Sequence, residues 1–203
     1  MTPTTLVLGS SSVYRARMLE RLGVPFVQES PDVDERAFDG LLGDLGPEGL
    51  ALRLARAKAD SLARPGGSRQ LLCADQVGVL EVEGAPPRLL HKPGTADACV
   101  AQLMALSGRT HALVNGIVLL DEATGEARTL VDRQELTMRP FEEAEARAYV
   151  ELRAPLDCAG GYRIEDEGVR LFERIRSDDH TGIVGLPLLA TARLLREAGL
   201  LAP

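Results

Sequence analysis

Apolar positions follow two different repeats along this chain, and the repeats predict strands that alternate with helices. Short apolar runs without helical spacing predict buried strands, and segments with apolar residues three or four positions apart predict helices. The predicted strands cover residues 6–8, 26–28, 71–80, 88–90, about 109–120, about 126–138 and 162–165. The predicted helices run from Ser12 to about residue 24 and cover 47–64, 96–106, 141–152 and 187–198. This alternation, together with one hairpin, predicts an α/β fold with a mixed sheet.

Turn signals mark the ends of several of these segments. Residues 121–125 supply the turn of the predicted hairpin, and Gly199 is expected to stop the last helix. Residues 40–47 are rich in Gly and Asp and predict a loop, whereas the acidic segment 30–35 has no helical period. Because no stretch has the composition of a linker, we expect one domain over residues 1–203.

The composition is typical of a soluble globular enzyme, with 45% hydrophobic and 26% charged residues. Aromatic residues make up only 3% and tryptophan is absent, so stacked aromatic platforms for nucleic-acid bases are not expected. The net charge of −7 also argues against a nucleic-acid surface, because neutralising many phosphates requires a basic stripe. This net charge is compatible with binding of a small anionic ligand, since a few local Arg and Lys side chains can outweigh a distant negative field.

The three cysteines, Cys73, Cys99 and Cys158, show neither metal-binding nor redox spacing. Their odd number and the lack of Cys-x-x-Cys pairs argue against a disulfide framework or a zinc site, and favour a reducing compartment. The first residues lack a basic segment followed by a long apolar run, and no segment approaches the roughly 18 apolar residues of a membrane span. We therefore expect a cytoplasmic protein without a membrane partner.

Residues 10–15 join the first strand to the first helix with three serines and an arginine, Arg15. The N-terminus of a helix attracts phosphate through its unpaired N–H groups and its dipole, and hydroxyls and a guanidinium add donors. The alternative is that Ser11 or Ser12 only caps the helix, as serine commonly does. The residues alone leave both interpretations open.

Asp75 stands inside the clearest buried strand, after four apolar or small residues and before Gln76 and Val77. A carboxylate in such a strand is costly unless it pairs, binds a metal or faces a cleft. Partial desolvation would also raise its pKa towards that of a general base. The alternative is a buried aspartate satisfied by backbone donors at a strand end, and we favour the chemical role.

Three further charged residues are candidates for binding phosphate or metal. Lys58 lies on an alanine-rich helix face, from which it could extend to solvent or reach a phosphate. Lys92 precedes Pro93, which favours an extended backbone and so aims the lysine side chain reproducibly. Glu35 follows Asp34 in a segment expected to be non-helical, where neighbouring carboxylates point apart and at most one would meet a given metal. A solvated acidic loop is the alternative for this pair.

Taken together, seven segments in this order resemble the Maf family of nucleoside triphosphate pyrophosphatases, and the resemblance covers nearly the whole chain. The segments are Ser10-x-Ser12-x-x-Arg15, Asp34-Glu35, Ala57-Lys58-Ala59, Ala74-Asp75-Gln76-Val77, Lys92-Pro93, Cys158-Ala159-Gly160-Gly161-Tyr162 and Thr181-Gly182-Ile183-Val184-Gly185-Leu186-Pro187. The resemblance implies a Maf-like or ITPase-like α/β fold, with an elongated mixed β-sheet flanked by helices and two lobes around a deep cleft.

The resemblance also implies metal-dependent hydrolysis of a nucleotide between its α- and β-phosphates, which releases the monophosphate and pyrophosphate. In this interpretation a divalent cation, Mg²⁺ or Mn²⁺, binds the triphosphate oxygens with Glu35 as its protein ligand. Asp75 orients or deprotonates the attacking water. Side chains from several segments hold the phosphates, namely Ser10, Ser12, Arg15, Lys58 and Lys92. The expected partner is thus a small nucleotide, and a homodimer stays open.

Within the resemblance, Tyr14, Gln76 and Glu165 occupy the positions that separate substrates. The combination of Tyr, Gln and Glu resembles the branch that acts on 7-methyl-GTP, whereas the dTTP and UTP branch would carry Arg, Thr and Gln. A Glu carboxylate can accept two hydrogen bonds, which matches the N1–H and the exocyclic amine of guanine. Val13 and His91 replace the usual proline and glycine, but they remove no charged group. The alternatives are a dTTP or UTP pyrophosphatase of the same family and a non-catalytic nucleotide-binding regulator of cell division.

Overall fold

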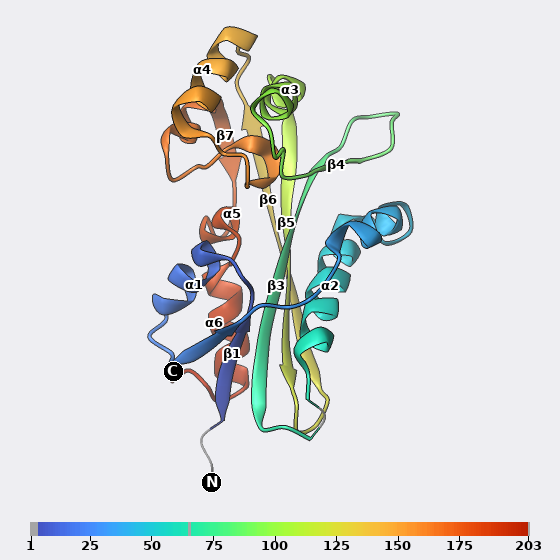
Figure 1. Ribbon diagram of the computed structural model, residues 1–203, viewed down its shortest axis with the longest axis vertical. Helices are drawn as coiled ribbons and strands as arrows, with labels where there is room; N and C mark the ends of the chain where they lie inside the picture. The colour runs from blue at the N-terminus through green and yellow to red at the C-terminus, as the bar shows by residue number, and fades with distance from the viewer. Residues whose placement is uncertain (1–3, 65, 203) are drawn as a thin grey trace. The chain divides into compact units, whose positions relative to one another are not determined.

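A computed structural model describes residues 4–64 and 66–202 of the chain and has a mixed seven-stranded sheet with helices packed on it (Figure 1). The strands are β1 (Thr5–Gly9), β2 (Phe26–Glu29), β3 (Arg69–Leu80), β4 (Arg88–Leu90), β5 (Thr110–Asp121), β6 (Ala127–Met138) and β7 (Phe172–Arg176). The helices are α1 (Val13–Glu20), α2 (Leu42–Leu62), α3 (Ala96–Leu106), α4 (Glu143–Arg153), α5 (Thr181–Val184) and α6 (Leu188–Glu197), with short 3₁₀ helices η1 (Glu35–Leu41), η2 (Ala159–Gly161) and η3 (Glu167–Leu171). The predicted α/β class and flanked mixed sheet are therefore confirmed.

The strand order is β2-β1-β3-β5-β6-β7, and β4 pairs with β3. β1 is parallel to both of its neighbours, so that Leu6 lies opposite Phe26 on one side and Gln70 on the other. β4 is antiparallel to β3, and β7 is antiparallel to β6. Parallel neighbours need a crossover connection, and α2 belongs to the segment that supplies it between β1 and β3.

The chain divides into two compact units. The first comprises Met1–Gln76, Val114–Asp132 and Asp179–Pro203, and the second comprises Val77–Leu113 and Arg133–Asp178. The strands β3, β5 and β6 each contribute residues to both units. The expectation of a single domain over residues 1–203 stays a prediction, as do the predicted lobes and cleft.

The first unit buries apolar side chains on both faces of its part of the sheet, because successive strand residues point to opposite sides. Leu8 and Leu72 face one side and pack with Leu195 of α6. The other side packs against α2, whose small residues let the helix approach closely. A Cβ atom at Gly116 of β5 would lie 2.3 Å from the backbone carbon of Ala51, so only glycine fits beneath this helix. Figure 1 shows α2 on the opposite side of the sheet from α1 and α6.

Of two local predictions before α2, the non-helical acidic segment holds through Asp34 and fails only at Glu35, whereas the predicted loop is wrong. The acidic segment turns helical at Glu35, where η1 begins, because the Asp34 carboxylate caps it by accepting from the Arg36 backbone N–H at 3.1 Å. The loop expected over residues 40–47 is instead the end of η1 and the start of α2, which is interrupted where Gly46 takes a φ of +66°. Glycine adopts this conformation without steric cost, and the helix continues beyond it.

The strand predicted over residues 162–165 is also wrong, and β7 replaces it further along the chain. Tyr162 is buried because its ring packs edge-on against His111 and Phe172, not because it belongs to the sheet. The polar sequence of β7 hides its strand character, since most of its side chains are exposed.

Among residues 4–64 and 66–202, no helix combines the length and hydropathy that a bilayer span requires.

Candidate active site

A buried ion pair between Lys58 and Asp75 forms the centre of the candidate site. Lys58 lies on α2 between alanines that pack against the sheet, and Asp75 lies near the end of the apolar run of β3. The Lys58 ammonium donates a hydrogen bond to Asp75 Oδ1, and the two side chains are only 6% and 7% exposed. Charges buried to this degree are found paired, because an isolated one would be strongly destabilising.

Glu35 adds a second carboxylate to the same ammonium. Its Oε1 lies 2.6 Å from Lys58 Nζ, while half of its side chain is exposed. Glu35 is the first residue of η1, so the capped start of this 3₁₀ helix brings it to α2. The structure thus brings together three residues that the sequence placed in separate segments.

The electrostatic surroundings raise the pKa of Asp75 above its ordinary value. Burial is the largest cause, and the Glu35 carboxylate adds to it. The positive charges of Lys58 and Arg15 act in the opposite direction but do not outweigh the burial. A carboxyl group with a raised pKa can accept a proton closer to neutral pH, which is the property a general base needs.

The serine-rich turn before α1 has the geometry of a helix cap. Ser12 Oγ accepts from the Arg15 backbone N–H at 3.3 Å, so the capping interpretation is confirmed for Ser12. Ser10 is buried, and its Oγ accepts from the Ser12 N–H at 3.1 Å and from Arg15 Nη1 at 3.4 Å. Arg15 also donates from Nε to the Gly185 carbonyl at 2.9 Å. Phosphate binding by this turn stays a prediction.

Gln76 follows Asp75 in β3 and therefore points to the opposite face of the sheet. Its amide nitrogen lies 2.7 Å from the Gly182 carbonyl, 3.2 Å from the Ile183 carbonyl and 3.3 Å from Asn115 Oδ1. Because carbonyl oxygens only accept, the nitrogen of the amide must face them. Gln76 is thus held by α5. This helix ends at Gly185, whose carbonyl accepts from Arg15.

The remaining specificity and phosphate candidates do not all lie in the first unit. Tyr14 is half-buried in α1 of that unit. Lys92, after β4, and Glu165, after Tyr162, belong to the second unit, where both side chains are exposed. Their contribution to the candidate site stays a prediction.

Two buried polar residues next to the site were not among the site residues predicted from the sequence. Asn115 is fully buried in β5 and donates to the Gly182 carbonyl at 2.9 Å. Asp179 is buried just before α5 and accepts hydrogen bonds from that helix. The signal that exposed Asp75, a polar residue inside an apolar run, also marks Asn115. No such signal marks Asp179, which lies in a polar stretch.

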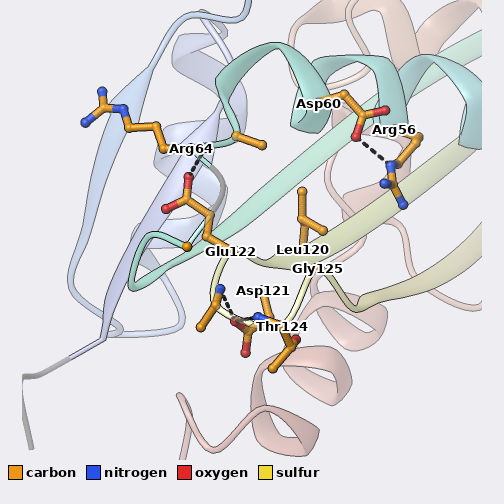
Figure 2. Close-up of a pocket in the computed structure, with 11 residues that line it drawn as sticks. Arg56, Asp60, Arg64, Leu120, Asp121, Glu122, Thr124 and Gly125 are labelled. Atoms are coloured by element: carbon orange, nitrogen blue, oxygen red, sulfur yellow. Dashed lines mark hydrogen bonds and ion pairs between the residues drawn. The ribbon is translucent and has the colours of Figure 1, made fainter.

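A separate pocket of about 340 Å³ lies elsewhere in the first unit, at the end of α2 and beside the β5–β6 turn (Figure 2). Its charged walls are occupied with internal pairs: Arg56 Nε lies 2.7 Å from Asp60, and the Glu122 carboxylate accepts from the Arg64 N–H at 2.8 Å. Its lining is Arg56, Asp60, Ala63, Arg64, Gly66, Leu120, Asp121, Glu122, Ala123, Thr124 and Gly125. The pocket contains none of the site residues predicted from the sequence.

The carboxylates of the candidate site suit a hard cation only in part. Among the described residues, no group of three or more His, Cys, Asp or Glu side chains is arranged to hold a metal ion. Glu35 and Asp75 gather around Lys58 and offer oxygen donors. Mg²⁺ commonly takes one or two carboxylates and completes its shell with substrate phosphates and water. The donor set therefore fits a cation bound together with a triphosphate, rather than one enclosed by the protein alone.

Comparison with known proteins gives consistent results over the full length of the chain. A sequence model of the family described as Maf-like protein matches residues 5–198. A protein named 7-methyl-GTP pyrophosphatase from Cupriavidus metallidurans is 40% identical over 198 residues, covering 98% of this chain and 95% of that protein. Proteins of the same name from Nitrosococcus oceani and Xanthomonas oryzae pv. oryzae are 38% and 40% identical, covering 97% and 98% of this chain and 94% and 98% of theirs.

A solved structure aligns with nearly the whole chain at low sequence identity. A nucleoside-triphosphatase, or dITP/XTP pyrophosphatase, from Mycobacterium abscessus aligns over 97% of both chains with 15% sequence identity. The TM-score of this alignment is 0.43.

Proposed function

This chain belongs to the Maf-like protein family, and we propose that it is a nucleoside triphosphate pyrophosphatase acting on 7-methyl-GTP. The reaction would hydrolyse the α–β phosphoanhydride bond and release 7-methyl-GMP and pyrophosphate. The names of the relatives at 38–40% identity support this substrate. Together with the site, they favour it over a dTTP or UTP pyrophosphatase and over a regulator without turnover.

The observation that carries the proposal is the buried Lys58–Asp75 pair. A regulator that only binds a nucleotide needs cations but has no need for a carboxylate with a raised pKa. Asp75 combines this raised pKa with a neighbouring ammonium that can face a phosphate. The combination is typical of a hydrolase that positions water next to a phosphoryl group.

In the proposed mechanism, Asp75 Oδ atoms orient the attacking water and take up its proton. The Lys58 ammonium would pass from its two carboxylates to a phosphate oxygen, where it offsets negative charge in the transition state. The Arg15 guanidinium, the Ser10 and Ser12 hydroxyls and the amides of α1 would hold other phosphate oxygens. Lys92 stays a candidate phosphate ligand predicted from the sequence.

A divalent cation, Mg²⁺ or Mn²⁺, fits this scheme as a group that arrives with the triphosphate. Glu35 would hold it through its carboxylate. When bound, it would neutralise charge on the departing pyrophosphate.

Base selection is assigned to Tyr14, Gln76 and Glu165. The Glu165 carboxylate is an acceptor that could receive the N1–H and amine of a guanine. Gln76 would act with its amide oxygen, because its nitrogen faces the carbonyls of α5.

A panel of nucleotides tests the proposal directly. Pyrophosphate release from 7-methyl-GTP, GTP, dTTP and UTP would be measured with and without Mg²⁺. We expect kcat/KM to be highest for 7-methyl-GTP and turnover to require the metal. A preference for dTTP or UTP would contradict the substrate, and binding without turnover would contradict the enzymatic function.

A further inference from the structure

A buried carboxylate outside the catalytic cluster, Asp179, fastens the segment that begins α5. One oxygen, Oδ1, accepts from the backbone N–H of Thr181 at 3.0 Å and from the Thr181 hydroxyl at 2.5 Å. The other, Oδ2, accepts from the N–H of Leu189 at 2.7 Å. Thr181 Oγ1 in turn accepts from the N–H of Leu188 at 2.8 Å. Asp179 and Thr181 thus tie the start of α5 to the start of α6.

Burial would raise the pKa of Asp179, but these hydrogen bonds outweigh it. The pKa of Asp179 is lowered because the Thr181 hydroxyl and the N–H groups of Thr181 and Leu189 donate to the ionised form. The carboxylate therefore stays charged at neutral pH and holds its donors as charge-assisted hydrogen bonds.

The segment fastened in this way directs its carbonyl groups at side chains of the candidate site. The Gly185 carbonyl accepts from Arg15 Nε at 2.9 Å. The Gly182 carbonyl accepts from Gln76 at 2.7 Å and from Asn115 at 2.9 Å. Gly185 ends α5 with a φ of +112°, a conformation that L side chains rarely adopt, and this turn aims its carbonyl group.

The bond to Gly185 matters because a guanidinium is planar. Once Nε and one terminal nitrogen are each held by an acceptor, the plane of the group and the directions of its other N–H donors follow. Arg15 Nη1 lies 3.4 Å from Ser10 Oγ, beside the N-terminus of α1. The terminal donors are therefore oriented before a ligand arrives.

We propose that Asp179, acting through Thr181 and the Gly185 carbonyl, is a positioning residue that orients Arg15 for the triphosphate. The inference rests on the proposed function, because it takes phosphate as the ligand of Arg15. Asp179 itself touches neither the substrate nor the reacting atoms. Its effect is to keep the turn at Gly185 in the one conformation that holds the guanidinium.

The main test uses two single variants, Asp179→Asn and Thr181→Val. Asp179→Asn places an amide where both carboxylate oxygens accept, and Thr181→Val removes the hydroxyl at nearly constant volume. Each change weakens the turn by about one or two hydrogen bonds, so we expect KM for the triphosphate to rise roughly tenfold with a smaller fall in kcat. Thr181→Ser keeps the hydroxyl and should restore KM to within about twofold of the unchanged protein.

Asp121 offers a matched control for the loss of stability. Its Oδ1 also accepts two backbone N–H groups, from Ala123 at 2.8 Å and Thr124 at 3.3 Å, at the β5–β6 turn shown in Figure 2. Asp121→Ala, which removes these acceptors, should lower the melting temperature and leave KM unchanged. A similar rise of KM in both variants would mean that Asp179 acts through stability alone, and would overturn the proposal.

A second measurement does not depend on turnover. The ¹⁵N NMR signal of the Arg15 Nε–H, assigned by its loss in Arg15→Lys, should exchange slowly with water in the full chain without nucleotide. In Asp179→Asn and Thr181→Val we expect exchange to be at least severalfold faster at equal temperature below the melting transition. Unchanged exchange would overturn the positioning role, whereas absence of turnover in the unchanged protein would overturn the proposed function instead.

Discussion

Two cations of the first unit, a buried lysine and a partly buried arginine, each lie between two carboxylates, and both clusters include a residue of β3. Arg69, at the start of the strand, pairs with Glu29 and Glu122. Lys58 pairs with Glu35 and with Asp75, which is six residues further along the same strand. The formal charges are the same in the two clusters, but the pKa of Glu122 is lowered whereas the pKa of Asp75 is raised.

The Arg69 cluster is saturated with hydrogen bonds. Its guanidinium donates to both oxygens of Glu122, at 2.9 and 2.6 Å, and to Glu29 at 2.9 Å. Another donor reaches the Leu62 carbonyl at 2.8 Å, and the N–H of Arg64 also reaches Glu122 at 2.8 Å. The hydrogen bond from Arg69 is the main cause that lowers the pKa of Glu122, and this outweighs the burial of the carboxylate.

The Lys58 cluster is held by an ammonium instead of a guanidinium. An ammonium is a compact charge with three donors and cannot match both oxygens of a carboxylate in one plane as a guanidinium does. Burial therefore dominates at Asp75 and raises its pKa. The comparison supports the proposal that the ammonium cluster keeps a carboxylate able to accept a proton and a cation able to change partners, and we expect the guanidinium cluster to serve stability.

Among the variants of the two clusters, Asp75→Asn should cause the largest loss of activity. The amide cannot take up a proton, so we expect kcat for 7-methyl-GTP to fall by roughly 10³-fold or more. Lys58 keeps Glu35 as a partner, so the fold should persist. The measurement is pyrophosphate release together with thermal unfolding, and turnover within tenfold of the unchanged protein would remove Asp75 from the mechanism.

Arg69→Met should lower the stability of the protein and leave its activity nearly unchanged. It leaves the buried Glu122 without its main partner, and we expect the free energy of unfolding to fall by about 3–5 kcal/mol. The kcat/KM of the folded fraction should stay within about twofold, since the cluster lies at the other end of this part of β3. Denaturant unfolding measures the first quantity. As a control, the double variant Arg69→Met with Glu122→Gln should recover part of the loss, because it removes the unpaired charge.

Lys58→Arg sharpens the comparison by giving the second cluster the cation of the first. A guanidinium at this position would donate to both oxygens of Asp75, lower its pKa and move less readily to a phosphate. We expect kcat/KM to fall by about 10- to 100-fold and its acidic limb to shift to lower pH. Equal kcat/KM and an unchanged pH profile would show that the nature of the cation is irrelevant.

The fold was predictable where periodicity reflects burial in the sheet, and not where a side chain is buried for another reason. The long apolar runs of β3 and β5 are strands because both of their faces are covered. Tyr162 produced the same apolar signal through ring contacts with His111 and Phe172, which no local pattern reveals. The turn of helix before Gly46 was equally hidden, because a single glycine can interrupt a helix without ending it.

The candidate site was predictable as a set of residues but not as a set of pairs. Asp75 is conspicuous because a carboxylate interrupts an apolar run. Its partner Lys58 and the second carboxylate, Glu35, are fixed only by how η1 and α2 pack. Glu122 gave no signal at all, since it lies in a polar turn and its carboxylate is paired by Arg69 and by the Arg64 N–H. Long-range ion pairs such as these depend on tertiary packing, which local spacing does not contain.

The smallest expected effect of the difference between the two clusters is on the pH dependence of stability. The lowered pKa of Glu122 contributes stability that is present above the unfolded pKa of about 4.3 and is lost as the pH falls through the folded value. The raised pKa of Asp75 acts in the opposite direction: its contribution is present below the unfolded value of about 3.9 and is lost as the pH rises through the folded value.

Difference curves separate these two groups from the other carboxylates, because each variant is compared with the unchanged protein at every pH. Relative to Asp75→Asn, the unchanged protein should gain stability as the pH falls from 7 towards 4, by at most about 1.4 kcal/mol per pH unit. Relative to Glu122→Gln, it should lose stability, and only below about pH 4.3. Urea unfolding at half-unit steps of pH measures both. Parallel curves for the two variants would mean that the ammonium and guanidinium clusters are electrostatically equivalent, and that the raised pKa of Asp75 has no basis.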